Sequence, residues 1–475
     1  MNCSLFPDKI EVSFTSKSVT RRPGVVSAAR FVRHTSVFKE IAALFEKYAP
    51  RPLLLYRYSH QDLLLQTLSL IFSGDYQLTA VEHAQFNPIF RYSTRTQRLA
   101  SAPTLSRFFS TLGEVCNLQR AAILEREAVT LDDLPNDDHR KISCPLMDSV
   151  TSRLLDHCLE IVAGKDPKCI VIDVDSTPIA LNGNQEMRKY DGAYQETAYL
   201  PIFVTINGVA AFAQNAPGAT NGAHLMLNQV EALLDTVQER FPGKLVVIRA
   251  DTGYNNDELI CRIEDKGAKY VIGCNAAGGR YIRPQLIRQI QHQCALSESF
   301  ARSLPTAVLE LFGDPKAFKL KAGNEADAEP FRCCGVVRDY QAQSWSQKRT
   351  VIYRLNYTPE HKDEANLRYI QTNLTVDELC AITQGRGERK GRSAPVLSFE
   401  LAEKDAKYAV ELYEALFCDR GQDERLNCEW KSECYASKCS LSGFFANSIR
   451  MAVCVLAMQF MARINNAVCP HGPRL

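Results

Sequence analysis

The chain has 475 residues, of which 45% are hydrophobic and 23% are charged, a composition typical of soluble globular proteins with more than one core. Its 56 Lys and Arg nearly balance its 54 Asp and Glu, giving a net charge of +2. This excludes a global positive field, so any surface for nucleic acid must be local. The 17 cysteines include no CxxC pair, which favours reduced thiols in a cytoplasmic protein.

Residues 1–160 are expected to form a mostly helical N-terminal domain. Apolar residues recur at helical spacing from about residue 36, for example over 62–72 and 105–112. The start of the chain lacks the apolar core of a signal peptide. The most apolar segment, residues 444–461, contains Asn447, Arg450 and Gln459, so it predicts a core helix and no membrane partner.

Residues 165–276 predict an α/β domain. The pattern gives three strands, then a helix, a strand, a helix and a last strand, an order typical of ribonuclease-H-like domains. Asn207-Gly208 lies between two apolar runs and predicts a tight hairpin. Asn255 is the expected N-cap of a helix over 257–266. The expected strands are 168–173, 198–206, 209–214, 244–249 and 269–273, and the first helix is 224–241.

A β-rich insertion over 277–398 is expected to interrupt this domain. Strand-like runs lie at 331–338, 349–357 and 369–373, and helical spacing resumes near 402, so that 399–475 would complete the domain. A glycine-rich loop within the insertion carries a basic cluster, which is either a phosphate-contacting loop or a solubilising linker. Its cationic residues are Arg386, Arg389, Lys390 and Arg392.

Three carboxylates stand at strand ends. Asp173 and Asp175 lie two residues apart on the expected first strand and so share a face. Two neighbouring buried carboxylates favour a bound cation, although a buried Asp satisfied by backbone or arginine is the simpler alternative. Asp251 ends the fourth strand before Gly253, where an Asp is also a common turn-former.

A third acidic position lies in a helical run far along the chain. Arg420, Glu424 and Lys431 follow one another at offsets of four and seven residues, which returns them to one face of a helix. Alone, this stripe indicates a solvated charged face with an Arg–Glu ion pair. Together with two strand-end Asp residues, it predicts a phosphodiesterase site holding two Mg²⁺ or Mn²⁺ ions.

These motifs resemble those of the DDE transposases of bacterial insertion sequences, group 1, and are most similar to insertion-sequence family thirteen-eighty. The family's second motif, D-x-G-Y/F, matches Asp251-Thr-Gly-Tyr254, and its first, an apolar strand ending D-x-T, matches Asp175-Ser-Thr177. Its third, Y-x2-R-x3-E-x6-K, matches Phe417, Arg420, Glu424 and Lys431 in every spacing, with Phe replacing Tyr. The resemblance covers roughly residues 50 to 465.

The resemblance implies Mg²⁺-dependent cleavage and transfer of DNA strands at the terminal inverted repeats of an insertion sequence. Asp175, Asp251 and Glu424 would be the catalytic metal ligands, with Asp173 behind them. Arg420 and Lys431 would contact DNA phosphates, and Phe417 would lack the hydroxyl hydrogen bond of the family's Tyr. The N-terminal domain would bind the DNA ends, and a homodimer would hold two of them.

Trp345 in the insertion has two interpretations: it stacks on an extruded DNA base, as in related insertions, or it belongs to the core of a small β domain. Two other functions compete with the transposase. One is a catalytically inactive, transposase-derived DNA-binding protein, which the three intact carboxylates disfavour. The other is a carboxylate-pair hydrolase such as a glycosidase. No G-x-x-x-x-G-K segment is present, so we expect no nucleotide cofactor.

Overall fold

The computed structural model describes residues 24–52, 54–75, 77–275, 286–288, 290–292, 295, 331–357, 366–383 and 403–468. The chain divides into two compact units. The first contains Met1–Pro167, Ile172–Asn228 and Gln422–Leu475, and the second Lys168–Val171 and Gln229–Gly421. The basic loop with Arg386, Arg389, Lys390 and Arg392 lies outside the described residues.

Helices make up most of the first unit, as the spacing of apolar residues predicted. Ahead of the first strand they are α1 (Gly24–His34), α2 (Ser36–Tyr48), α3 (His60–Phe72), η1 (Leu78–Ala80), α4 (Val81–Ala84), α5 (Pro88–Thr94), α6 (Ala102–Arg126), α7 (His139–Ile142) and α8 (Pro145–Ala163). Helix α9 (Gly222–Leu227) follows the strands, and the last helix is α18 (Phe444–Val468).

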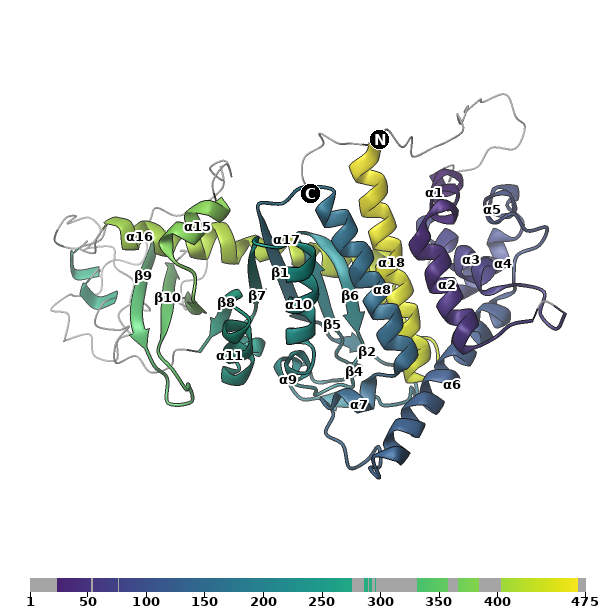
Figure 1. The fold of residues 1–475 in the computed structure, drawn as a ribbon, viewed down its shortest axis with the longest axis horizontal. Helices are drawn as coiled ribbons and strands as arrows, with labels where there is room; N and C mark the ends of the chain where they lie inside the picture. Colours follow the sequence, from purple (N-terminus) through teal and green to yellow (C-terminus); the bar gives the residue numbers. More distant parts are fainter. Residues whose placement is uncertain are drawn as a thin grey trace, which may run out of the picture. The chain divides into compact units, whose positions relative to one another are not determined.

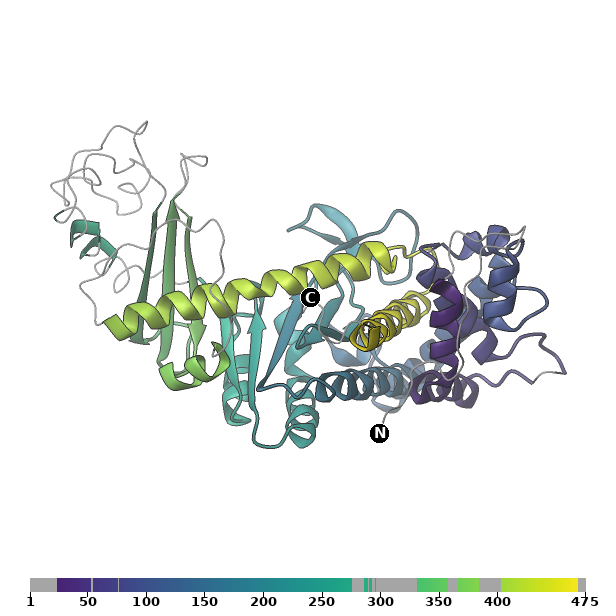
Figure 2. The same cartoon turned by 90° about the horizontal axis from the view of Figure 1, so that it is seen from above.

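Helix α18 is the core helix of this unit. It packs against α6, α8 and the strand β6 (Val209–Gln214), and Figures 1 and 2 show it running beside α8. In the described part of the chain α18 alone is long and apolar enough to cross a membrane, but 94% of that stretch is buried inside the structure. The prediction of a core helix at 444–461 is therefore confirmed.

Strand β1 (Cys169–Ser176) begins in the second unit and ends in the first. In the first unit the sheet order is β6, β5 (Ile202–Ile206), β1, and all pairs are antiparallel. The β5–β6 hairpin turns at Asn207 and Gly208, whose φ angles are 48° and 72°. Both values are left-handed, as the predicted Asn-Gly turn requires.

A small sheet in the first unit was not predicted. Its strands are β2 (Ile179–Ala180), β4 (Glu196–Tyr199) and β3 (Lys189–Asp191), in that order. Strands of two to four residues are too short to show an alternating pattern. They lie between β1 and β5, so the predicted strand at 198–206 is two strands rather than one.

The second unit is built on a mixed sheet in the order β7, β8, β11, β10, β9. Strands β7 and β8 are parallel, and the remaining neighbours are antiparallel. Because β11 pairs with β8, the strands of the predicted insertion extend this sheet. The bounds are β7 (Leu245–Ala250), β8 (Lys269–Cys274), β9 (Phe331–Tyr340), β10 (Arg349–Tyr357) and β11 (Asn366–Thr372).

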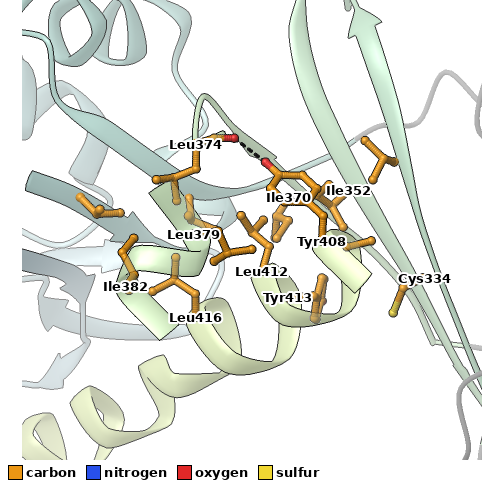
Figure 3. Close-up of a cluster of buried hydrophobic side chains, with 14 residues drawn as sticks. Cys334, Ile352, Ile370, Leu374, Leu379, Ile382, Tyr408, Leu412, Tyr413 and Leu416 are labelled. Atoms are coloured by element: carbon orange, nitrogen blue, oxygen red, sulfur yellow. Dashed lines mark hydrogen bonds between the residues drawn. The ribbon is translucent and has the colours of Figure 1, made fainter. Parts of the chain in front are cut away.

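Helices cover this sheet through an apolar cluster shown in Figure 3. The strands contribute Cys334, Ile352 and Ile370, while α15 (Val376–Thr383) contributes Leu379 and Ile382. Leu374 lies between β11 and α15, and the other labelled side chains come from the helical run of α16 (Glu403–Val410) and η6 (Glu411–Phe417). The Tyr408 hydroxyl donates to the Leu374 carbonyl. The segment after 402 is thus anchored to strands that precede it by up to 70 residues.

The α/β order predicted from the sequence is confirmed in this unit and the first, with two corrections. The predicted helix at 224–241 is interrupted, and α10 (Val230–Arg240) follows α9 after a break at Asn228 and Gln229. Helix α11 (Asp257–Asp265) is capped by Asn256, which accepts from the Leu259 amide, and not by Asn255. The Asn255 side chain instead accepts from Gln371 of β11.

Candidate active site

Strand β1 brings the first acidic motif to its end. Its charged residues are Asp173, which is buried, and Asp175, which is half-buried, and the buried Thr177 follows the strand. In the antiparallel register Asp173 pairs with Thr205 and Asp175 with Phe203. Opposed residues of such a pair share a face of the sheet, so both carboxylates lie on the face that carries Phe203.

The third motif lies on a helical run whose residues contact this strand end. Helix α17 (Gly421–Cys428) continues into the π-helical segment η8 (Glu429–Glu433). Asn427 Nδ2 donates to Asp175 Oδ2 at 2.9 Å, and Lys431 Nζ donates to Thr177 Oγ1 at 2.8 Å. Within the first unit, the structure therefore joins the first motif to the part of the third that contains Lys431, some 250 residues further along the chain.

Glu424 belongs to the same helical stripe. It lies three residues before Asn427 and seven before Lys431, and such offsets return to one face of a helix. Its side chain is exposed. Asn427, three residues further along the same helix, contacts Asp175, so the exposed Glu424 lies about one helical turn from that contact.

Trp430 fixes this helix against the sheet. It is fully buried, and its ring stacks on Phe203 with centroids 5.1 Å apart and an angle of 18° between the planes. Its Nε1 donates to the Met451 carbonyl of α18 at 3.3 Å. Since Phe203 pairs with Asp175 on the neighbouring strand, the stacked rings set the distance at which Asn427 and Lys431 approach β1.

Two opposing effects act on the charged form of Lys431. Burial lowers its pKa below the usual value for lysine, while the Asp175 carboxylate acts in the opposite direction. A cation that is half removed from water and next to a carboxylate is well placed to meet a further anion. A DNA phosphate is one such anion.

Asp251 occupies the end of β7 in the second unit, as predicted. It caps the short helix η2 (Thr252–Tyr254), and its Oδ1 accepts from the Gly253 amide at 2.9 Å. The neighbouring strand β8 approaches this turn at Gly273, where a Cβ atom would lie 2.7 Å from both the amide nitrogen and the hydroxyl of Thr252. Only glycine at 273 allows this close approach without displacing the turn.

The other predicted DNA contacts of the second unit lie in two places. The Arg420 guanidinium lies 5.8 Å from the centre of the Phe417 ring, which in turn packs against Tyr413. Trp345 is only 7% exposed and packs edge-on against Tyr340, at 5.5 Å between ring centres. The structure thus places Trp345 in the core of the β-rich segment, and a contact between Trp345 and DNA remains a prediction.

The donor chemistry of the predicted ligands fits a divalent cation, because Asp175, Asp251 and Glu424 offer hard carboxylate oxygens. Among the described residues, no group of three His, Cys, Asp or Glu side chains gathers as a ready metal site. Asp175 and Glu424 belong to the first unit and Asp251 to the second. Their convergence on shared ions therefore remains a proposal.

Asn427 and Gly273 are the two residues of these motif surroundings that the sequence did not reveal. Asn427 stands at a helical offset from both Glu424 and Lys431, so the spacing could have placed it on the stripe. Nothing in its residue type pointed to Asp175. Gly273 lies at the end of an apolar run, and its importance depends on a turn that follows a different strand.

The chain matches a known protein family. The family model described as transposase DDE domain group 1 matches residues 3–473, and the chain belongs to this family. The protein is thus a DDE transposase.

Among solved structures, the chain is similar to the piggyBac transposase in a cryo-EM synaptic complex with hairpin DNA. The identity is 11% and the TM-score 0.42, over 94% of this chain and 76% of that one. No curated protein matches the chain.

Proposed function

We propose that this transposase cuts and transfers DNA strands at the terminal inverted repeats of a bacterial insertion sequence of family thirteen-eighty type. The observation that carries the proposal is the contact between the first and third motifs, through Asn427 with Asp175 and Lys431 with Thr177. If this helix were only a solvated charged face, a buried polar side chain such as Asn427 would not be expected to contact the carboxylate at the end of β1.

In this proposal Asp175, Asp251 and Glu424 hold Mg²⁺ or Mn²⁺. Bound ions of this kind activate a water or a 3′-hydroxyl and stabilise the leaving oxygen. The chain itself supplies three further functions. Asn427 orients the Asp175 carboxylate, Lys431 and Arg420 hold DNA phosphates near the cut, and the buried Asp173 supports the strand end.

The wider features of the proposal follow from the family resemblance. The domain boundaries would be 1–160, 165–276, 277–398 and 399–475, with a ribonuclease-H-like domain split by the insertion and an N-terminal domain at the DNA ends. A homodimer would hold two ends in the cytoplasm, without a nucleotide cofactor. Phe417 in place of Tyr removes one hydroxyl and weakens the hold on phosphate without removing a metal ligand.

The test is cleavage of duplexes that carry the two ends of the element encoding this chain. Asp175→Asn, Asp251→Asn and Glu424→Gln each remove one charged oxygen with little change of shape, and each should lower Mg²⁺-dependent cleavage by more than about a hundredfold. Glu433→Gln is the matched control, because Glu433 is exposed on the same helical run. Full cleavage by any of the three variants would remove that residue from the assignment.

A further inference from the structure

Two packed helices of the first unit carry an unusual excess of positive charge. Residues 24–34 and 83–98 together contain five arginines and neither Asp nor Glu, in a chain whose net charge is only +2. The first stretch is helix α1 and the second contains helix α5. The two helices pack against each other, and Figure 1 shows them side by side.

The arginine side chains of these helices converge. Burial lowers the pKa of the Arg33 guanidinium, and the positive charges of Arg95 and Arg30 lower it further, whereas Tyr92 acts in the opposite direction. The Nε and Nη1 atoms of Arg33 are buried and have no hydrogen-bond partner among the described residues. Arg33 is therefore surrounded by like charge, an arrangement that an anion would relieve.

The surroundings of Arg33 are open to solvent. Arg91 and Arg95 are exposed, and Tyr92 between them is 70% exposed. Arg91 lies in the last turn of α5, and Arg95 is the C-cap residue that follows it, with a left-handed φ of 53°. We call Arg30, Arg33, Arg91, Tyr92 and Arg95 the α1–α5 basic face.

Several other arginines of the first unit are paired with a carboxylate. Arg120 pairs with Glu186 at 2.9 Å, Arg140 with Asp138 at 2.6 Å and Arg153 with Asp156 at 2.8 Å. Among the described residues, Arg33, Arg91 and Arg95 take part in no such ion pair. Unneutralised arginines gathered beside an exposed tyrosine are typical of surfaces that bind nucleic-acid phosphates.

We propose that the α1–α5 basic face binds the phosphate backbone of duplex DNA, and that it does so without divalent ions. The inference rests on the proposed function in one respect, namely that DNA is the substrate. Arginine guanidinium groups donate in a fork that fits phosphate oxygens, and the Tyr92 hydroxyl is a further donor. Backbone contacts of this kind position the duplex and carry no sequence information themselves.

The experiment measures binding of the full-length protein to a fluorescent duplex in EDTA, over a series of KCl concentrations. The test variant is Arg91→Gln/Arg95→Gln, since both residues are exposed. The control variant is Arg126→Gln/Arg240→Gln, which removes the same charge from exposed positions on α6 and α10. Arg33 is left intact because its side chain is partly buried.

The slope of log K against log salt should fall in magnitude by up to about 1.8 in the test variant, at about 0.9 for each phosphate that is no longer neutralised. Affinity near 0.1 M salt should fall at least tenfold, and the control should stay close to the wild type. An unchanged slope, or an equal loss in the control, would overturn the inference. So would a wild-type preference for single-stranded RNA over the duplex.

A second measurement separates this inference from the proposed function. Cleavage by the wild type in Mg²⁺ and binding by Arg91→Gln/Arg95→Gln in EDTA are measured separately. If the wild type cuts DNA and Arg91→Gln/Arg95→Gln still binds normally, the basic face is wrong and the catalytic proposal stands. If the wild type cuts nothing while the double variant loses salt-dependent binding, the catalytic proposal is wrong and the proposal for the α1–α5 basic face stands.

Discussion

Replacing Asn427 tests whether the contact between the two motifs serves catalysis. The Asn427 side chain is 6% exposed, its Nδ2 donates to Asp175, and its Oδ1 is buried with no partner among the described residues. Asn427→Leu keeps the volume of the side chain. It removes one hydrogen bond to a charged group, worth about 1.5–3 kcal/mol, and at the same time relieves one unsatisfied buried acceptor, worth about 1–3 kcal/mol.

The two contributions nearly cancel for folding, so the melting temperature of Asn427→Leu should stay within a few degrees of the wild type. They do not cancel for function, because only the hydrogen bond holds the Asp175 carboxylate. Residues that orient metal-binding carboxylates are typically worth 10–100-fold in metal affinity or activity. We therefore expect the Mg²⁺ concentration for half-maximal cleavage to rise about 10–100-fold.

The assay combines Mg²⁺ titration of cleavage, calorimetric titration of Mg²⁺ into the DNA-bound protein, and thermal unfolding. Arg425→Gln is the matched control, because Arg425 is exposed on the same helix and pairs only with Glu429 among the described residues. A purely structural role for Asn427 would lower the melting temperature and leave the Mg²⁺ requirement as in the wild type. Cleavage within twofold of the wild type at limiting Mg²⁺ would refute the positioning role.

Three further changes have definite outcomes. Gly273→Ala places a methyl group 2.7 Å from the Thr252 amide nitrogen; it should destabilise the protein by about 1–3 kcal/mol in urea unfolding, and displacement of the Asp251 turn should lower cleavage about a hundredfold. Lys431→Met should weaken binding to the cleavage-site duplex and reduce its salt slope by about 0.9, and an unchanged slope would place Lys431 off the DNA. Burial lowers the pKa of His157 from 6.5 to about 4, so the folded state favours neutral histidine. The contribution of neutral His157 to the free energy of unfolding is complete above pH 6.5. It falls by about 3 kcal/mol as the pH drops towards 4. His157→Phe should flatten that part of the stability profile between pH 7 and 4 in urea unfolding.

Local signals in the sequence predicted the elements of the fold well where one rule decided the structure. The Asn207-Gly208 turn follows from backbone sterics alone, and the buried strands β1, β7 and β8 follow from short, mostly apolar runs. The prediction of the N-cap of α11 was wrong, and the predicted residue contacts a residue that is distant in sequence. The Asn255 side chain accepts a hydrogen bond from Gln371 of β11, and the N-cap residue is Asn256.

The candidate site shows the same division. The sequence suggested Asp175, Asp251, Arg420, Glu424 and Lys431 as site residues because this combination of residue types and spacings is unusual. It did not suggest Asn427, since an amide in a charged helix has no signal of its own. Its role is created by what it faces, and the facing residue, Asp175, lies 252 positions earlier in the chain.

The residue that brings these partners together is apolar. Trp430 lies between Asn427 and Lys431 in sequence, stacks on Phe203 and donates its Nε1 hydrogen to the Met451 carbonyl. A buried aromatic pair of this kind contributes about 0.5–1.5 kcal/mol beyond the burial of its surface. More importantly, it leaves the helix little freedom to slide along β1, because Phe203 is fixed opposite Asp175 by the strand register. Catalysis requires the reacting groups to be placed to within well under an ångström. The spacing of the third motif is therefore constrained by the packing of Trp430 as much as by the chemistry of Glu424 and Lys431.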